Sequence, residues 1–310
     1  MELIYFDKYV KRGLFDKLVV AIGQFDGFHL AHMELLNKVK IRAKAVDAKT
    51  ALITFDPHPD FVLKKNLDLT YISPLVDKAK DLAKMEFDYL IVIKFNNEVA
   101  NTDPSDFVRN YLDKINVCEV VVGFDFRFGH FGKGTPEMIK SLSNNIKEVH
   151  IIDEIKYHDV KLGTTLIREL LSKGDVSTVI DVLGHPYTIE GEVVTGRKVG
   201  RTINLPTANL QVSPDYVKVK EGVYSVLVEY KGTEYMGIAN YGHNPSFNYK
   251  SNVTLEVHIL DFNGDLYGET IKVKFIKYLR DEIKFSSKEE FIKQINEDIS
   301  NTKTIINRAL

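Results

Sequence analysis

The sequence predicts two domains of different class, an α/β domain with a parallel sheet and then an antiparallel β-barrel with a terminal helix. In the first half, short apolar runs alternate with segments of helical periodicity, which is typical of a parallel sheet covered on both faces. After residue 184, β-branched and aromatic runs follow one another with turn residues between them, which favours a small barrel. The 310 residues suffice for about two domains. We therefore predict domains at residues 1–183 and 184–310.

Five apolar runs are expected to form the strands of the N-terminal sheet. They lie at residues 18–22, 51–55, 89–93, 117–122 and 149–152. Helical patterns occupy the intervals, at residues 30–45, 74–85 and 104–115. The second and third helices are expected to start at Pro74 and Pro104, where the missing N–H of proline costs no hydrogen bond.

The C-terminal half has strand-like segments as far as residue 279. They lie at residues 187–196, 222–230, 233–241, 253–260 and 270–279. Lys231-Gly232 and Asn263-Gly264 are dipeptides typical of hairpin turns. A final helix is expected to begin with a capping box made by Ser287 and Glu290. Apolar residues at helical spacing share one face of this helix: Phe291, Ile295 and Ile299.

The composition excludes several classes of protein. A formal net charge of −2 argues against a general nucleic-acid surface. The single cysteine, Cys118, excludes an internal disulfide framework, and its apolar surroundings predict a buried strand residue. The N-terminus lacks the pattern of a secretory signal, and no apolar run approaches the roughly 18 residues that span a bilayer. We expect a soluble cytoplasmic protein that binds small molecules, without nucleic-acid or membrane partners, and leave its oligomeric state open.

The segment from Ile22 to His32 runs from the end of a predicted strand through a glycine turn into a helix. His29 and His32 are three residues apart at the helix start and therefore lie on one face. The free N–H groups and the dipole of a helix N-terminus favour phosphate, and two imidazoles there would hold a triphosphate as pyrophosphate leaves. Two solvated histidines would explain the spacing alone. Because open α/β sheets bind ligands at the carboxyl ends of their strands, we favour a phosphate site.

Other segments place polar side chains at the same predicted edge. His58 follows the second strand, and Asp125 and Arg127 follow the fourth. Thr165 and Arg168 open a later helix, where a hydroxyl and an arginine would form a second anion site. Each residue also has a simpler explanation as part of a turn, an ion pair or a helix cap. Their joint occurrence favours one shared binding edge.

The tetrapeptide Pro-Thr-Ala-Asn at residues 206–209 is rare. The hydroxyl of Thr207 and the amide oxygen of Asn209 are two residues apart after a proline, so both can face one Mg²⁺ and its phosphates. The preceding loop contributes Gly196 and Arg201, which would bring backbone N–H groups and positive charge to a polyphosphate. An ordinary proline turn, with Asn209 capping its own backbone, fits these residues equally well.

Nearly the whole chain resembles the bacterial bifunctional riboflavin kinase/FAD synthetase family. The resemblance rests on the motifs FDGxHxxH, TFxPHP, GxDFRFG, TxxIRxxL, PTAN, GVYxV, LEVHxLDF, DLYG and a late Leu-Arg-Asp-Glu. It implies an N-terminal nucleotidyltransferase domain of Rossmann-like fold that converts FMN to FAD. It also implies a C-terminal six-stranded barrel that phosphorylates riboflavin to FMN. ATP would be the co-substrate of both reactions, with Mg²⁺ as cofactor.

The same resemblance implies roles for residues of the N-terminal domain. Contacts with the phosphates of ATP are expected from His29, His32, His58, Thr165 and Arg168, of which the first two histidines would take part in catalysis. Asp125 and Arg127 would help to shape the flavin pocket.

In the kinase domain, the resemblance implies that Thr207 and Asn209 organise Mg²⁺ and the ATP phosphates. Glu256 would be the general base for the 5′-hydroxyl of the ribityl chain, and Arg280 would lie on the flavin side. Strand alternation alone leaves Glu256 open between a solvent-facing residue and a site residue. One carboxylate beside the attacking hydroxyl suffices, because phosphoryl transfer needs mainly alignment and charge neutralisation.

Three departures from the family pattern lie in the N-terminal half. Gln24 replaces the usual Asn, Ala31 replaces a Gly between the histidines, and Gly163 replaces a Ser. The Cβ of Ala31 would narrow a close approach of ATP to the helix start. Two alternatives to a bifunctional enzyme therefore stay open. One is a riboflavin kinase whose N-terminal domain binds ligand without turnover, and the other is a flavin- or nucleotide-sensing regulator, which has no need of a general base.

Overall fold

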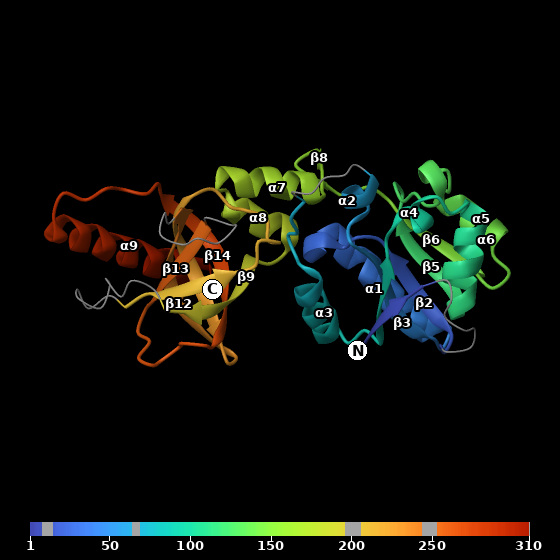
Figure 1. The fold of residues 1–310 in the computed structure, drawn as a ribbon, viewed down its shortest axis with the longest axis horizontal. Coiled ribbons are helices and arrows are strands. Elements are labelled where there is room, and N and C mark those ends of the chain that lie inside the picture. Colours follow the sequence, from blue (N-terminus) through green and yellow to red (C-terminus); the bar gives the residue numbers. More distant parts are fainter. Residues whose placement is uncertain (8–14, 64–68, 196–205, 244–252, 310) are drawn as a thin grey trace. The chain divides into compact units, whose positions relative to one another are not determined.

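The computed structural model describes residues 1–7, 15–63, 69–195, 206–243 and 253–309. The chain forms two compact units, Met1–Gly163 and Thr164–Leu310, whose ribbon is drawn in Figure 1. The boundary expected from the sequence lies between residues 183 and 184, whereas the contacts group α7 (Thr164–Lys173) and α8 (Val176–Leu183) with the second unit. Across the described ranges, no helix has both the length and the apolar character needed to cross a membrane.

The first unit contains a six-stranded sheet in which all neighbouring strands are parallel. The strand order is β1-β4-β3-β2-β5-β6. The strands are β1 (Glu2–Phe6), β2 (Leu18–Ile22), β3 (Lys49–Asp56), β4 (Tyr89–Lys94), β5 (Val117–Gly123) and β6 (Glu148–Ile152). The five strands predicted from the sequence are confirmed. The prediction missed β1, because Leu3 and Tyr5 of this edge strand are exposed and it lacks the continuous buried run of a central strand.

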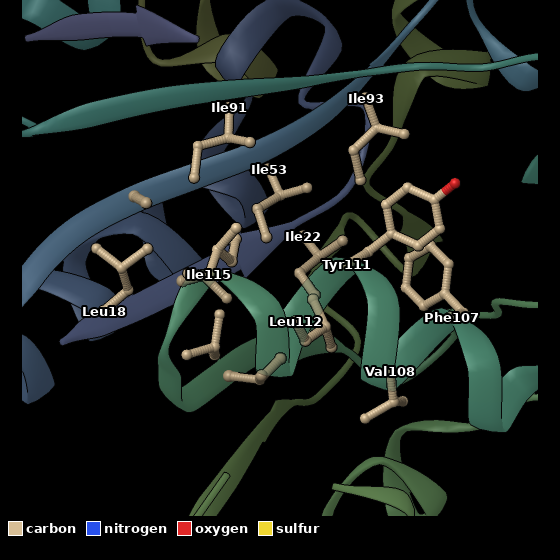
Figure 2. Packing of buried hydrophobic residues seen from close by; sticks show 14 of the residues in the cluster. Leu18, Ile22, Ile53, Ile91, Ile93, Phe107, Val108, Tyr111, Leu112 and Ile115 are labelled. Atoms are coloured by element: carbon tan, nitrogen blue, oxygen red, sulfur yellow. The ribbon is translucent and has the colours of Figure 1, made fainter. Parts of the chain in front are cut away.

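Alternate residues of the central strands pack into cores on opposite faces of this sheet. Val19 and Ala21 belong to the core that includes α1 (Leu30–Ala45) and α3 (Leu75–Lys84). Leu18 and Ile22 belong to the other core, against the segment 104–115. Figure 2 shows this second core, with Ile53, Ile91 and Ile93 of the sheet facing Phe107, Tyr111, Leu112 and Ile115. Cys118 is buried on its strand, as predicted.

The predicted helix at residues 104–115 is irregular. It begins as α5 (Pro104–Phe107), widens into the π-helical turn η2 (Val108–Leu112) and ends in the 3-10 turn η3 (Asp113–Ile115). Pro104 opens it, as predicted, and the side chain of Asp103 caps it. The remaining short elements of this unit are η1 (Asp26–Phe28), α2 (Pro59–Leu63), α4 (Asn97–Ala100), η4 (His130–Gly132), α6 (Pro136–Leu142), β7 (Lys156–Tyr157) and β8 (Val160–Lys161).

The connections of the sheet change sides between β2 and β5, which are neighbours. The connection that follows β2 packs on one face through α1, whereas the connection that follows β5 packs on the other through Ile139 of α6. In open α/β sheets, ligands bind at such a switch point, beyond the carboxyl ends of the strands. The topology therefore points to the loops that follow β2 and β5.

The second unit contains a closed antiparallel barrel of six strands, as the sequence and the resemblance predicted. The order around the barrel is β10-β13-β12-β11-β14-β9. The strands are β9 (Tyr187–Val194), β10 (Ala208–Val212), β11 (Gly222–Tyr230), β12 (Thr233–His243), β13 (Val253–Ile259) and β14 (Thr270–Arg280). Leu255 and Val257 of β13 are buried and Glu256 between them is only partly buried, so Glu256 faces the outside of the barrel.

One of the two predicted hairpin turns is confirmed. Lys231 and Gly232 join β11 to β12 with positive φ angles of 48° and 82°, the pattern of a type I′ turn. The prediction at Asn263-Gly264 is wrong, because β13 and β14 are not neighbours in the barrel. The chain there makes a longer connection, in which Asp261 and Gly268 have the positive φ angles.

The chain ends in α9 (Lys288–Ala309), the predicted terminal helix. Half of the predicted capping box is present, since Oγ of Ser287 accepts the N–H of Glu290 at 3.1 Å. The carboxylate of Glu290 reaches back to the N–H of Ser286, at 3.0 Å, instead of to Ser287.

A buried ion pair holds α9 against β14. Nη2 of Arg280 lies 2.7 Å from Oδ2 of Asp298, and its Nε donates to the same carboxylate. Gln294 donates to the other carboxylate oxygen at 3.2 Å. Asp298 is only 2% exposed, so its charge depends on these partners.

We expect Asp298→Ala to lower the free energy of unfolding of the second unit by about 3 kcal/mol, because it leaves the guanidinium of Arg280 without its counter-ion in a largely buried place. Urea unfolding followed by circular dichroism measures the change. Lys303→Ala is the control, since Lys303 and Asp261 form an ion pair that is exposed to solvent. Equal shifts in both variants would contradict the importance given to the buried pair.

Candidate active sites

The first site lies on the loop that joins β2 to α1. Phe25 and Phe28 adopt left-handed φ angles of 47° and 45°, on either side of Gly27 at 81°. Bulky residues avoid this conformation unless their surroundings hold it. Both rings are buried in the core beneath α1, and this packing fixes the sharp bend that delivers His29 to the helix start.

His29 and His32 stack on each other at the start of α1. Their ring centroids are 3.6 Å apart and the rings are inclined by 15°. Nδ1 of His29 accepts the backbone N–H of His32 at 3.3 Å, so His29 caps the helix with its side chain. Because Nδ1 is the acceptor, a neutral His29 ring has its proton on Nε2. This N–H is available as a hydrogen-bond donor.

Both imidazoles are neutral at pH 7. Burial lowers the pKa of His29 to about 4. The pKa of His32 also lies well below its usual range, first because of burial and then because of His29 and Lys78 nearby. The pair therefore offers hydrogen bonds to an anion but no positive charge of its own.

The loop that follows β5 brings Asp125 close to this pair. Burial has the largest effect on the pKa of His29 and lowers it, whereas the nearby carboxylate of Asp125 raises it. Asp125 also accepts a hydrogen bond of 2.5 Å from Nζ of Lys161, on β8. Arg127 is exposed, and its Nη1 donates to the carbonyl of Phe126 at 2.8 Å. The switch point thus unites the loops after β2 and β5, as its topology indicates.

The other predicted phosphate contacts lie on separate elements. His58 follows β3 at the same edge of the sheet, where Nδ1 accepts the N–H of Asp60 at 3.1 Å and the backbone N–H donates to the hydroxyl of Tyr71. Thr165 and Arg168 lie on α7, which belongs to the second compact unit. The roles of all three residues stay predictions.

Three buried polar atoms of the first site have no hydrogen-bond partner within the described part of the chain. They are Nε2 and Oε1 of Gln24 and Nδ1 of His32. Buried polar groups in folded proteins are almost always paired, so each exception calls for an explanation. A ligand that supplies the missing partners is the explanation that fits a loop at the switch point.

The second candidate site lies on the outer face of the barrel. Glu256 on β13 is directly opposite Asn209 on β10 and directly opposite Asn240 on β12. The structure therefore places a carboxylate between two amides on three adjacent strands. Thr207 comes just before β10. The carbonyl oxygen of its neighbour Pro206 accepts a hydrogen bond of 2.9 Å from Nδ1 of His258.

Sequence reasoning missed Asn240. Its Nδ2 donates to Oε1 of Glu282 at 2.8 Å, whereas its buried Oδ1 has no partner among the residues that the structure describes. Glu282 packs directly on β12, because a Cβ added to Gly242 would lie 2.5 Å from its carboxylate. The amide of Asn240 is thus held from one side, with its oxygen left for another partner.

A cavity of about 230 Å³ lies beside Thr207. Most of its walls come from β13 and from the connection between β13 and β14. Its lining consists of Val193, Pro206, Thr207, Ala208, Val257, Ile259, Phe262, Asn263, Gly264, Asp265, Leu266 and Tyr267. The apolar part of this lining suits a flat ring, and its polar part can supply hydrogen bonds.

The roles of three further residues of the kinase site, Gly196, Arg201 and Arg280, stay predictions. The guanidinium of Arg280 is engaged by Asp298, so the structure shows it in a structural ion pair, and its role beside flavin stays a prediction. Gly196 and Arg201 lie outside the described residues.

Comparison with known proteins accounts for both halves of the chain. Residues 13–166 match the FAD synthetase family and residues 183–306 match the riboflavin kinase family. Bifunctional riboflavin kinase/FMN adenylyltransferases are similar over most of their length. That of Listeria monocytogenes is 37% identical over 286 residues, covering 92% of this chain and 91% of the relative. That of Bacillus subtilis is 37% identical over 287 residues, covering 91% and 90%.

A solved structure shares the whole architecture. It is described as a macrolide-efflux protein from Streptococcus pneumoniae, and it superposes with a TM-score of 0.88 at 30% identity, covering 97% of this chain and 98% of its own. The full-length relatives and the two family matches agree with each other and with the two compact units. The chain belongs to the bifunctional riboflavin kinase/FMN adenylyltransferase family and is an enzyme of that family.

Proposed function

We propose that the outer face of the barrel phosphorylates riboflavin and that the switch point of the parallel sheet carries the adenylyl transfer to FMN. The observation that carries the first assignment is the row of Asn209, Glu256 and Asn240 on adjacent strands. The second assignment rests on the neutral pair of His29 and His32 at the start of α1. Both reactions consume ATP, so the cytoplasm is the expected location.

In the kinase reaction, Glu256 accepts the proton of the ribityl 5′-hydroxyl. The hydroxyl oxygen forms a bond to the γ-phosphorus of ATP, the bond from that phosphorus to the bridging oxygen breaks, and ADP leaves. Such transfer depends mainly on alignment and charge neutralisation, so one carboxylate at the attacking oxygen is sufficient. The position of Glu256 between two amides supports this role, because they limit where its carboxylate can point.

Thr207 and Asn209 fit a Mg²⁺ ion. They are two residues apart at the start of an extended strand, so their side chains share one face. A hydroxyl and an amide oxygen are hard ligands, and Mg²⁺ typically takes few protein ligands and completes its shell with phosphates and water. Bound there, the ion would neutralise charge on the transferring phosphate. We place the nucleotide base in the adjoining cavity, against the ring of Phe262.

In the adenylyl transfer, a phosphate oxygen of FMN forms a bond to the α-phosphorus of ATP and pyrophosphate leaves. His29 donates from Nε2 to the polyphosphate, and the free N–H groups of the first turn of α1 bind phosphate oxygens beside it. His58, which follows β3 at the same edge of the sheet, adds a contact to the phosphates. Asp125 and Arg127 form part of the wall against the flavin.

A second candidate function follows from the departures at the first site. The buried amide of Gln24 has no partner among the residues that the structure describes, and Ala31 places a Cβ in the first turn of α1. A first unit that binds nucleotide or flavin without turnover would tolerate both. The chain would then be a riboflavin kinase with a binding domain. A sensor without any chemistry is less compatible with Glu256 in its row of polar residues.

We expect the purified protein to form FMN from riboflavin and FAD from FMN, each with ATP and Mg²⁺. Glu256→Gln should lower the riboflavin kinase rate by about 10²- to 10⁴-fold, the usual contribution of a general base, and leave FAD synthesis unchanged. His29→Ala should have the opposite selectivity, with FAD synthesis reduced by about 10²-fold. Chromatographic separation of the flavins measures both activities in one preparation.

Each variant serves as the folding control of the other, because its second activity must persist. FMN without FAD from the wild-type protein would support the kinase with a binding domain. Loss of both activities in Glu256→Gln would contradict the assignment of one reaction to each unit.

We also expect Asn240→Ala to lower kcat/KM for riboflavin phosphorylation by about tenfold, the cost of one hydrogen bond of ordinary strength or slightly more. The reason is that Oδ1 of Asn240 gains its missing partner only in the substrate complex. Steady-state kinetics measure the effect, with FAD synthesis as the internal reference. Asn301→Ala, on the exposed face of α9, is the matched control and should leave both activities unchanged. Wild-type kinetics in Asn240→Ala would exclude the contact.

A further inference from the structure

The first unit contains a lysine that is almost completely withdrawn from solvent. Lys78 lies on α3 and is 3% exposed. Lysine is almost never buried to this extent unless it has a partner. Its Nζ donates to the backbone carbonyl of Gln24, in the loop between β2 and α1. A lysine from a different helix thus reaches into the loop that presents the two histidines.

The same carbonyl receives a second donor from the sheet. Oγ1 of Thr54, on β3, lies 3.3 Å from the oxygen of Gln24. The next residue but one, Asp26, accepts the N–H of Ser73 through its side chain at 2.9 Å. The loop between β2 and α1 is therefore held by side chains and backbone from outside it, and the donor from α3, Lys78, carries a positive charge.

The charge of Lys78 depends on its burial and on two nearby carboxylates. Burial lowers the pKa of Lys78 to about 8, while Asp26 in η1 and Asp56 at the end of β3 act in the opposite direction. The residue is therefore mainly a cation at pH 7. His32 on α1 lies near enough for the charge of Lys78 to be one cause of the low pKa of that imidazole, after burial and His29. The charge of Lys78 therefore acts both on the loop between β2 and α1 and on the histidine pair.

A polyphosphate needs compensating positive charge, and the histidine pair supplies none at pH 7. We propose that Lys78 is a positioning residue of the adenylyl-transfer site, which fixes the phosphate-binding loop through the carbonyl of Gln24 and supplies the buried positive charge behind it. This inference rests on the proposed function of the first unit. Lys78 adds a buried positive charge to the site without placing two protonated imidazoles in contact.

The kinetic test compares Lys78→Met and Lys78→Arg with wild type, using FMN, ATP and Mg²⁺. We expect kcat/KM for ATP in FAD synthesis to fall about ten- to a hundred-fold in Lys78→Met, the loss of one charged hydrogen bond, and to recover in part in Lys78→Arg. Riboflavin phosphorylation should not change. Lys80→Met removes an exposed lysine from the same helix and should have wild-type activity in both assays.

A pH profile separates this role from a purely structural one. In wild type, kcat/KM for ATP in FAD synthesis should decrease as the pH rises through about 8, because Lys78 then loses its proton. The arginine variant should lose this alkaline decrease, since a guanidinium stays charged. If Lys78 only tethered α3, the wild-type and Lys78→Arg proteins would have the same pH profile.

An NMR titration of the histidine C2 protons tests the coupling without turnover. Lys78→Met should raise the pKa of His32, because a positive charge near it has been removed, and Lys78→Arg should keep it low. An unchanged titration of His32 in a folded Lys78→Met protein would overturn the inference, as would FAD synthesis at the wild-type rate. If Lys78→Met does not fold, the pH profiles of the wild-type and Lys78→Arg proteins provide the test. A decrease of kcat/KM for ATP at alkaline pH in both proteins would overturn the inference.

Failure of the proposed function gives a different result. A wild-type protein that makes FMN but no FAD at any pH would refute adenylyl transfer in the first unit. The histidine titration would still show whether Lys78 acts on the phosphate-binding loop.

Discussion

The change of side between β2 and β5 is the constraint on which the first site depends. Because the connections after these neighbouring strands pack on opposite faces, their first residues diverge and leave the carboxyl ends of both strands open. The loop after β2 must then turn sharply to enter α1, and the buried rings of Phe25 and Phe28 hold that turn. His29 caps the helix as a consequence, and Asp125 approaches it from the other loop. The candidate chemistry of this unit is thus a product of sheet topology.

Both sites share a second property, which is buried polar atoms without partners in the described structure. In the first unit these atoms belong to Gln24 and His32, and in the second Oδ1 of Asn240 is such an atom. Leaving a buried donor or acceptor unpaired costs stability, and folded proteins seldom do so. The cost is acceptable where a ligand completes the hydrogen bonds. Such a site is organised before its substrate arrives, and the substrate does not have to order it.

Most of the architecture could be predicted from the sequence, because continuous apolar runs mark parallel strands and β-branched runs with turns mark a barrel. The predictions that were wrong or missed depend on which residues are neighbours in space, and local sequence does not show this. The turn at Asn263-Gly264 looked like a hairpin, but local residues do not say which strands pair. Asn240 was missed because its position opposite Glu256 depends on strand register. Lys78 was missed for a related reason. Leu75, Ala79 and Leu82 of α3 face the core, and a lysine within that pattern is normally taken as exposed.

The protonation of the histidine pair limits how the first candidate site can compensate the charge of a polyphosphate. Two stacked imidazoles with centroids 3.6 Å apart cannot both be charged at moderate cost, since each charge opposes the other. Burial already holds both rings neutral, so they can align a polyphosphate by hydrogen bonds but cannot neutralise it. A side chain that adds positive charge at this site has to stay charged near pH 7 in spite of burial. A lysine with a high intrinsic pKa meets that condition even when burial lowers its pKa to about 8, whereas a histidine starting near 6.5 does not. In the proposed kinase site, Thr207 and Asn209 would instead compensate phosphate charge by holding a metal ion. On these proposals, a buried lysine adds positive charge at the first site and a bound ion supplies it at the second, according to the side chains that each fold offers to the phosphates.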